Sequence, residues 1–333
     1  MKKKLVLRYI LLKILKLNGM IFLSGKIFRR KLIDFWRINN TSVLLKNILL
    51  LMRPKQYIKN SFVFAPIFFS FQFSNSSKIL IVISVFIAFC IASSSVYVLN
   101  DIFDIEEDIA HPIKKHRPLA SGQVSKNLAY SLSILLLLLS LWISFSISEK
   151  ACLIIFLYFL LNLAYSIKLK HIPIIDVVIV SIGFVMRVVA GGAAISVDIT
   201  MWIIIITFLL SMFLAIAKRR DDIVLAKDGI KTRKNIDAYN LEFINSSLVL
   251  VVGIITMSYI QYTLSIEIQH KFGTNKLYFT TLFVLIGFLR YLQIVFVNRK
   301  SGDPTEVLWT DRFLQLIIVA WLVSFYWLVK IWR

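Results

Sequence analysis

Cysteine and histidine are scarce in this sequence, and basic residues far outnumber acidic ones. Its 333 residues include two cysteines, four histidines and 18 acidic residues, against 39 lysines and arginines. Cys90 and Cys152 lie in apolar runs, without a CxxC pair or a histidine at metal spacing, so we expect lipid-buried side chains rather than a zinc or redox site. The sequence also shows no convincing internal repeat, which disfavours a transporter built from inverted repeats.

Apolar residues make up 58% of the chain, and the mean hydropathy is +0.78, whereas a soluble domain is usually about 45–50% apolar. Nine apolar segments are each close to the ~20 residues that cross a bilayer as a helix. Backbone amides in lipid must be satisfied internally, and these segments are too long for barrel strands. We therefore predict an all-α polytopic membrane protein with nine transmembrane helices. The predicted limits are 58–74, 79–99, 127–147, 150–167, 173–195, 200–217, 245–266, 277–297 and 313–331.

Lysine and arginine are distributed unequally between the two sides of this predicted bundle. If the N-terminus is cytoplasmic, only six of the 39 basic residues fall on the opposite side, as the positive-inside rule requires. This asymmetry explains the net charge of +21 without nucleic acid. Acidic residues gather in the same long cytoplasmic loops, whereas the external loops are short, so we expect the active site on the cytoplasmic side. The cytoplasmic segments are then 1–57, 100–126, 168–172, 218–244 and 298–312.

The first 45 residues are basic and precede the predicted catalytic domain, residues 46–333. Arg8, Lys13 and Lys16 interrupt the apolar stretch and no small-residue cleavage site follows, so a signal peptide is disfavoured. A basic amphipathic helix on an anionic leaflet fits better. A poorly ordered basic tail is the open alternative.

The stretch NDIFDIEEDIAHPIKKHRP, Asn100–Pro118, follows the second apolar segment. On a helix that extends this segment, Asp101, Asp104 and Asp108 occupy one stripe. Like charges on one stripe need a cation between them, and Mg²⁺ takes one or two carboxylates plus substrate phosphates. Lys114 and Arg117 follow, which suggests a diphosphate site with metal on one side and basic residues on the other. A solvated acidic helix end is the alternative, although it opposes the helix macrodipole.

Further polar residues lie at the ends of other segments or, as with Arg187, within one. Arg187 lies inside the fifth segment, where a charge usually faces a polar cavity, and Asp176 lies on the same helical face. A structural ion pair is the alternative for Arg187. Lys218 and Asp222 are four residues apart and can pair on one face of a helix, so a purely structural ion pair is the alternative to a role in binding. The remaining candidates are Arg53, Lys59, Asn60, Tyr165, Lys168 and Lys170.

Several motifs together resemble the UbiA superfamily of intramembrane prenyltransferases. The NDxxDxxxD motif from Asn100 follows the second predicted helix, and RPKQYIKN from Arg53 is similar to the superfamily's RPxQWxKN, with Tyr57 in place of tryptophan. The resemblance covers roughly residues 48–333 and is greatest to the decaprenyl-phosphate phosphoribosyltransferase branch. The stretches that favour this branch are the segment from Asn100, YSIKLKHIPIIDVVIVSIGFVMRVVAGGAA, AKRRDD and GDPTEVLWTDRFLQL.

This resemblance implies transfer of a 5-phosphoribosyl group from phosphoribosyl diphosphate to a polyprenyl phosphate in a bacterial cytoplasmic membrane. Aromatic prenyltransferases of the superfamily usually carry a second DxxxD motif after the sixth span. Here Leu225 and Ala226 stand four residues after Asp221 and Asp222. This departure disfavours the aromatic reaction with a prenyl diphosphate donor, but that reaction stays open because Asp228 is available.

The resemblance also implies roles for the candidates. Asp101, Asp104 and Asp108 are expected to bind Mg²⁺, or Mn²⁺ in its place. Lys59, Lys114, Arg117, Lys168 and Lys170 are expected to hold the diphosphate and the 5-phosphate, and Arg187, Lys218 and Arg219 the lipid phosphate. A loop ending at Asp303, Asp311 and Arg312 is expected to close the site, with Asp311 near the ribose. Arg53, Asn60, Asn100, Tyr165 and Asp222 complete the substrate-binding set. A homo-oligomer is left open.

Overall fold

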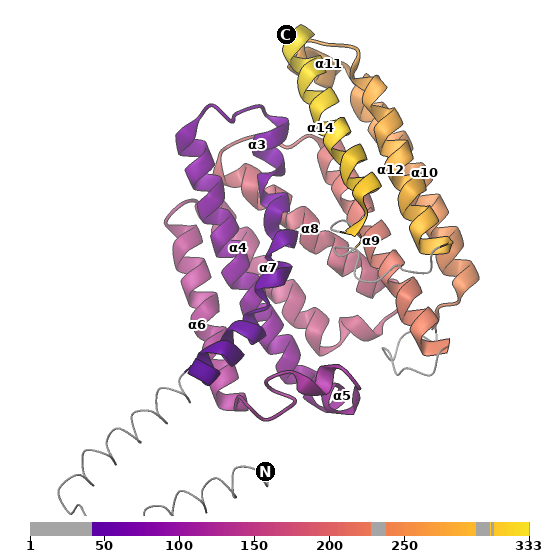
Figure 1. Cartoon of the computed structure of the whole chain (residues 1–333). Helices are drawn as coiled ribbons and strands as arrows, with labels where there is room; N and C mark the ends of the chain where they lie inside the picture. Colours follow the sequence, from indigo (N-terminus) through magenta and orange to yellow (C-terminus); the bar gives the residue numbers. More distant parts are fainter. Residues whose placement is uncertain (1–41, 228–237, 298–306, 308–309, 333) are drawn as a thin grey trace, which may run out of the picture. The chain divides into compact units, whose positions relative to one another are not determined.

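A computed structural model of the chain describes residues 42–227, 238–297, 307 and 310–332 (Figure 1). The chain divides into two units, Met1–Leu49 and Leu50–Arg333. Of the first unit only residues 42–49 are described, as the start of the apolar helix Ser42–Met52. The predicted extension over residues 1–45 therefore falls almost wholly outside the described residues, as do Asp228 and Asp303.

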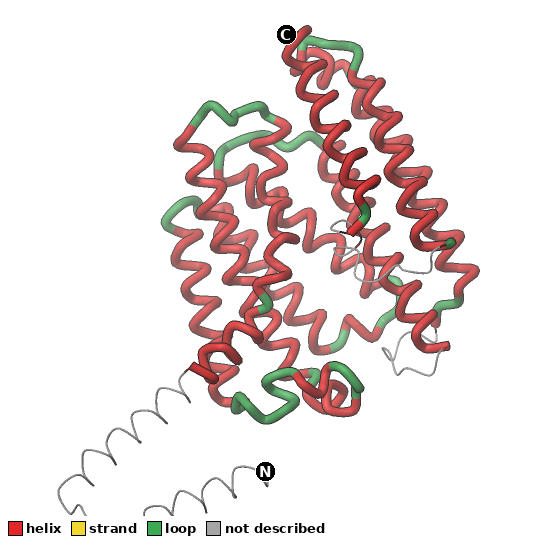
Figure 2. Tube along the Cα trace, in the orientation of Figure 1, coloured by secondary structure: helices red, strands yellow, loops and turns green. Residues whose placement is uncertain are grey.

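Every regular element among the described residues is a helix (Figure 2), which confirms the all-α prediction. Eight helices of the second unit are long and apolar enough to cross a membrane, and they coincide with eight of the nine predicted segments. These are α4 (Ser76–Phe103), α6 (Lys126–Phe145), α7 (Glu149–Ile167), α8 (Ile175–Ala194), α9 (Met201–Lys227), α10 (Leu241–Leu264), α12 (Thr281–Phe296, preceded by η5, Leu277–Thr280) and α14 (Arg312–Trp332).

The first predicted segment, 58–74, differs, so the count of nine spans is not confirmed. The chain here forms a 3₁₀-helix, η1 (Pro54–Phe64), followed by the short α3 (Ala65–Phe69), and a turn begins at Ser70. Proline has no amide hydrogen, so Pro66 cannot continue an α-helical ladder to the carbonyl of Phe62. The amide of Ala65 donates to that carbonyl instead, with 3₁₀ spacing.

Helix packing builds the second unit from two groups of helices joined by α8. In the first group, α4 packs against α6, α7 and η1, around the fully buried Val82, Val85 and Phe89. In the second, α9 packs against α10, and α12 packs against α14. Helix α8 contacts both α7 and α9, and Figure 1 shows it between them. Elements from both groups therefore contribute to any site near α8.

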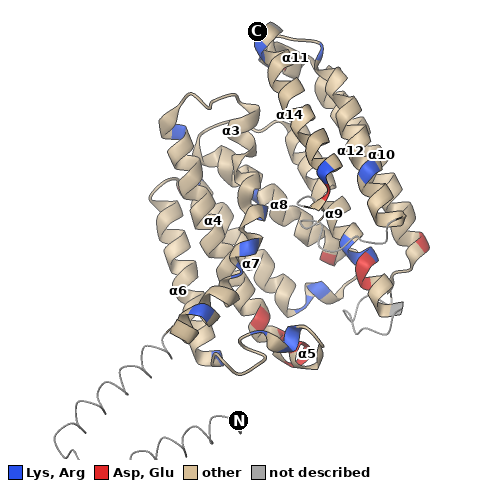
Figure 3. Ribbon diagram, in the orientation of Figure 1, with Lys and Arg blue, Asp and Glu red and all other residues tan. Residues whose placement is uncertain are grey.

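Successive long helices alternate in direction, so the C-terminal ends of α4, α7 and α9 lie at the same end of the unit. The short elements α5 (Ile105–Ala110), η2 (Lys114–His116) and η3 (Leu169–His171) connect helices there, while α11 (Ile266–Phe272) follows α10 at the other end. Acidic and basic residues gather around α5 and the last part of α9, while most of the helix lengths carry few charged residues (Figure 3). We call this end the charged end.

Candidate functional site

The three aspartates predicted to share one stripe lie at the end of α4 and in α5. The helical course is interrupted at Asp104, but the backbone bonds continue: the amide of Asp104 donates to Asn100 (2.9 Å), and that of Asp108 donates to Asp104 (2.8 Å). Asp101 and Asp108 are each only 2% exposed. Two carboxylates buried this deeply require charged or hydrogen-bonding partners.

Two arginines supply those partners. Nη1 of Arg117 donates to Oδ1 of Asp101 (3.0 Å) and to Oδ2 of Asp108 (2.7 Å). Arg53 also pairs with Oδ1 of Asp101, and its guanidinium lies 5.2 Å from the centre of the Tyr97 ring. Arg53 has a left-handed backbone, with φ 53° and ψ 57°, so the chain turns sharply there. We call Arg53, Asp101, Asp108 and Arg117 the arginine–aspartate cluster.

Asp104 belongs to a second set of contacts, with residues of α7 and η3. Lys170 pairs with Oδ1 of Asp104, and the side-chain amide nitrogen Nδ2 of Asn100 donates to Oδ2 of Asp104 (2.8 Å). The hydroxyl of Ser166 in turn donates to the amide oxygen of Asn100 (3.2 Å). The structure therefore brings the predicted residues Asn100, Asp104 and Lys170 together, and it adds Ser166, which sequence reasoning missed.

The carboxylate oxygens of this site can be compared with the ligands that the expected metal ion requires. Oxygens of Asp101 and Asp108 converge on one cationic nitrogen of Arg117, so this pair can face a single positive centre. In the described chain, however, no three His, Cys, Asp or Glu side chains are grouped so that they could hold a metal ion. Since Mg²⁺ needs only one or two carboxylates when substrate phosphates complete its shell, the pair fits Mg²⁺. A role for Asp104 at the metal stays a prediction.

The connector between α5 and α6 presents Arg117 to both aspartates, and His111 organises its start. Nδ1 of His111 accepts from the amides of Ile113 (3.1 Å) and Lys114 (3.3 Å), so this nitrogen carries no proton. Partial burial, and then the positive charge of Lys114, lower the pKa of His111 from its ordinary value of about 6.5. The folded connector therefore contains a neutral histidine at pH 7.

We expect the connector to loosen in acid because of His111. Its folded-state pKa is lowered, so a locally unfolded connector takes up the proton first as pH falls below about 6.5. Stability from this residue is thus fully present above that pH and is lost below it. Hydrogen exchange of residues 111–117 should be faster at pH 5.5 than at pH 7.5, after correction for the intrinsic rate. His111→Asn provides a control, since asparagine can bond the amide two residues on without titrating; an unchanged pH response in this variant contradicts the prediction.

Arg187 and Asn60, both predicted to bind substrate, lie inside the helix bundle. Arg187 is 5% exposed and donates to the side-chain oxygen of Asn60 (2.7 Å), the carbonyl of Gly183 (2.6 Å) and the hydroxyl of Tyr158 (2.9 Å). Rings of Phe89, Tyr158 and Phe184 surround its guanidinium at 4.8–5.6 Å. Among the described residues no carboxylate pairs with it, so the alternative of a structural ion pair is not found. A role for Arg187 and Asn60 in binding stays a prediction.

Arg219 pairs with Asp176, a residue that the sequence placed on the face of Arg187. Nε of Arg219 donates to Oδ2 of Asp176 (2.6 Å), and Nη1 donates to Asp222 (3.3 Å). The hydroxyl of Tyr239, missed by sequence reasoning, donates to Oδ1 of Asp176 (3.0 Å) and accepts from the amide of Ile174 (2.5 Å). Asp176 and Arg219 are 0% and 2% exposed. Burial raises the pKa of Tyr239, so its hydroxyl keeps the proton that it donates.

The other predicted site residues are placed less centrally. Asp311 accepts from the amide of Leu314 (2.8 Å), at the start of α14, and from Arg290 (2.7 Å). Hydrogen bonds from Arg290 hold the pKa of Asp311 below its ordinary value, and its contact with ribose stays a prediction. Lys168 is exposed at the end of α7, while Lys59, Lys114, Tyr165 and Lys218 are half-buried.

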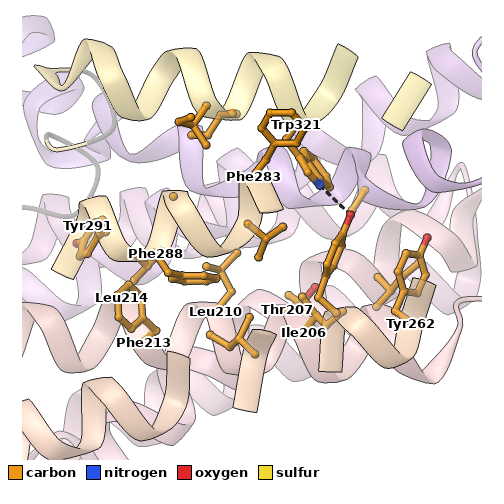
Figure 4. Close-up of a pocket in the computed structure, with 18 of the residues that line it drawn as sticks. Ile206, Thr207, Leu210, Phe213, Leu214, Tyr262, Phe283, Phe288, Tyr291 and Trp321 are labelled. Atoms are coloured by element: carbon orange, nitrogen blue, oxygen red, sulfur yellow. Dashed lines mark hydrogen bonds between the residues drawn. The ribbon is translucent and has the colours of Figure 1, made fainter. Parts of the chain in front are cut away.

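An apolar pocket of about 420 Å³ lies among η1, α3, α9, α10, α12 and α14. Its walls include Phe69, Leu210 and Trp321, and Figure 4 shows Leu210, Phe213, Phe288 and Trp321 around it. The indole nitrogen of Trp321 donates to the hydroxyl of Tyr259 (2.8 Å), so these two polar groups of the wall are paired with each other. A pocket of this size and polarity suits an apolar ligand.

An apolar helical bundle with helices of membrane-spanning length, buried charge at one end and an apolar pocket has the features of a polytopic membrane protein. The model of the UbiA prenyltransferase family matches residues 62–328. The chain therefore belongs to the UbiA prenyltransferase family and is a multi-pass membrane protein.

Two curated relatives are similar over most of their length. A decaprenyl-phosphate phosphoribosyltransferase of Corynebacterium glutamicum is 32% identical over 276 residues, covering 81% of this chain and 82% of the relative. One of Mycolicibacterium smegmatis is 31% identical over 295 residues, covering 84% and 91%. Among solved structures, a UbiA homologue from Archaeoglobus fulgidus bound to GPP and Mg²⁺ superposes with a TM-score of 0.63 at 19% identity, covering 85% of this chain and 99% of the homologue. That likeness concerns the fold alone.

Proposed function

We propose that the protein transfers the 5-phosphoribosyl group of phosphoribosyl diphosphate to the phosphate of a polyprenyl phosphate and releases diphosphate. The observation that carries this proposal is the similarity to two decaprenyl-phosphate phosphoribosyltransferases over more than four fifths of the chain. The charged end and the apolar pocket support it, because the reaction joins a highly anionic donor to a lipid.

The donor is proposed to bind at the arginine–aspartate cluster and the adjoining pair of Asp104 and Lys170. Asp101 and Asp108, with Asp104 beside them, would hold Mg²⁺, or Mn²⁺ in its place, which when bound neutralises charge on the departing diphosphate. The basic side chains near these carboxylates stabilise the same charge through hydrogen bonds. In this role we place Arg53, Lys59, Lys114, Arg117, Lys168 and Lys170.

In the proposed reaction the bond between ribose C1 and the diphosphate oxygen breaks, and a bond from C1 to an oxygen of the lipid phosphate forms. Because the lipid phosphate is already anionic at pH 7, no strong general base is required. Positive charge develops on the ribose as the diphosphate leaves. The protein therefore contributes mainly positioning and electrostatic stabilisation.

The lipid is proposed to place part of its chain in the apolar pocket, with the rest of a long polyprenyl chain in the membrane. Lys218, half-buried near the end of α9, is the preferred anchor for its phosphate. Arg187 and Arg219 are engaged with buried neighbours and are proposed to maintain the shape and charge of the site. We propose that the charged end faces the cytoplasm of a bacterial cell, because the described connectors at that end are rich in basic residues, among them Lys114, Lys115, Arg117, Lys168 and Lys170.

Labelled phosphoribosyl diphosphate, polyprenyl phosphate and Mg²⁺, incubated with the purified protein in nanodiscs, test this proposal. We expect a labelled lipid product and one equivalent of diphosphate, with less product when the metal is chelated. Absence of labelled lipid would overturn the proposal. Product formed instead from 4-hydroxybenzoate and a prenyl diphosphate would assign the aromatic reaction, and transport without turnover would indicate a carrier.

A further inference from the structure

The connector between α7 and α8 contains an unusual backbone turn at Ile174. Its φ of 68° and ψ of −49° lie outside the regions that β-branched residues normally occupy. The amide of Ile175 donates to the carbonyl of Pro173 (2.8 Å), which closes a γ-turn of the rare, strained type. The Ile174 side chain is 53% exposed, so burial of that side chain does not explain the turn.

A buried hydrogen-bond relay holds this turn. The amide of Ile174 donates to the hydroxyl of Tyr239 (2.5 Å), which donates to Asp176 (3.0 Å), and Asp176 accepts from Arg219 (2.6 Å). All three side chains of the relay are less than 10% exposed. Tyr239 comes just before α10, Arg219 lies in α9 and Asp176 in the first turn of α8. The strained turn is therefore fixed from the second group of helices.

The same connector reaches the acidic residues of the first group. Lys170 lies in η3, a few residues before the turn, and pairs with Asp104 at the end of α4. A connector this short transmits a change of direction at Ile174 directly to Lys170. The position of Lys170 is thus set from two sides: by Asp104 at the charged end, and by Tyr239 through the turn.

We propose that Tyr239 and Asp176 are positioning residues that, by holding the γ-turn at Ile174, keep Lys170 against the donor diphosphate site. The proposal rests on the proposed function for the identity of the donor, but the contacts themselves do not depend on it. A merely structural relay would stabilise the fold without any specific effect on donor binding. The two possibilities differ in which kinetic constant responds and in whether relief of the turn restores it.

Tyr239→Phe removes the hydroxyl and preserves the ring, including its stacking on Phe243. We expect the KM for phosphoribosyl diphosphate to rise about tenfold while kcat changes less than about threefold, because a contact present in both ground and transition states is weakened. Hydrogen exchange of residues 168–176 should become faster. Tyr130→Phe is the matched control, since Tyr130 is 42% exposed on α6, and it should change neither quantity.

Glycine at position 174 provides the rescue, because it adopts positive φ without strain. Ile174→Gly combined with Tyr239→Phe should return the donor KM to within about threefold of the wild type. If Tyr239→Phe does not fold, the donor KM of the folded double variant decides: a value within about threefold of the wild type supports the proposal, and a KM about tenfold higher, or no folded protein, overturns it. Unchanged KM and exchange in Tyr239→Phe, or a loss of kcat alone without rescue, also overturn it. If the wild type transfers no phosphoribosyl group, the proposed function fails, while the exchange measurements still decide whether the relay holds the turn.

Discussion

Asp101→Asn is expected to lower kcat/KM for phosphoribosyl transfer by about 10³-fold, or about 4 kcal/mol of transition-state stabilisation. Asp101 is 2% exposed and accepts from Arg53 and Arg117 through one oxygen. Asparagine keeps the shape but loses the negative charge that orients both guanidinium groups and that a metal ion requires. Initial rates with labelled phosphoribosyl diphosphate, measured on purified folded variant, give this ratio.

Glu106→Gln is the matched control for the loss of one carboxylate. Glu106 lies in α5 between Asp104 and Asp108, and its side chain is exposed. We expect its kcat/KM to stay within about twofold of the wild type, since an exposed charge is screened by water. An Asp101→Asn variant that retains more than about a tenth of wild-type activity would remove Asp101 from the catalytic site.

Gly191→Ala is expected to destabilise the fold by about 3 kcal/mol, at the upper end of the usual cost of overpacking. A Cβ built on Gly191 would lie 2.1 Å from the carbonyl oxygen of Val63, where α8 meets η1. The obstacle is backbone, which cannot rotate away as a flexible side chain can, so η1 or α8 must shift. Chemical or thermal unfolding in detergent micelles measures the change.

Gly253→Ala tests whether the effect comes from this close approach rather than from glycine replacement in general. A Cβ at Gly253, within α10, meets nothing within 4 Å, and alanine gains up to about 1 kcal/mol in helix propensity. This variant should therefore be as stable as the wild type or slightly more stable. Equal stability of the two alanine variants would show that α8 and η1 are not packed this closely.

The apolar segments predicted most of the fold because burial in lipid leaves little freedom: a long run without charge must form a spanning helix. The segment at 58–74 does not form one spanning helix. Pro66 lacks an amide hydrogen and η1 has 3₁₀ hydrogen bonds, and hydropathy measures neither property. The approach of this segment to Gly191 is likewise a property of two packed elements. No pattern within either segment specifies that distance.

At the charged end, helical periodicity identified Asp101, Asp104 and Asp108 as candidates, but their contacts divide them: Asp101 and Asp108 share Arg117, while Asp104 pairs with Lys170. Periodicity could not predict which cations would meet them, because Arg53 and Lys170 come from distant parts of the chain. The same limit applied to Asp176, whose spacing suggested Arg187 but whose partner is Arg219. No sequence pattern indicated a role for Tyr239, since a tyrosine ahead of an apolar helix is common. Its hydroxyl gains partners only in the tertiary structure, where it contacts Ile174 and Asp176.

One guanidinium nitrogen, that of Arg117, donates to two aspartates that are about two helical turns apart in the sequence. The free energies attached to Asp101 and Asp108 are consequently not separable quantities, because removing either one also alters the environment of the other. Single-residue scans across this stretch would count the same attraction twice. A thermodynamic cycle through both single variants and the double variant measures this shared interaction free energy directly.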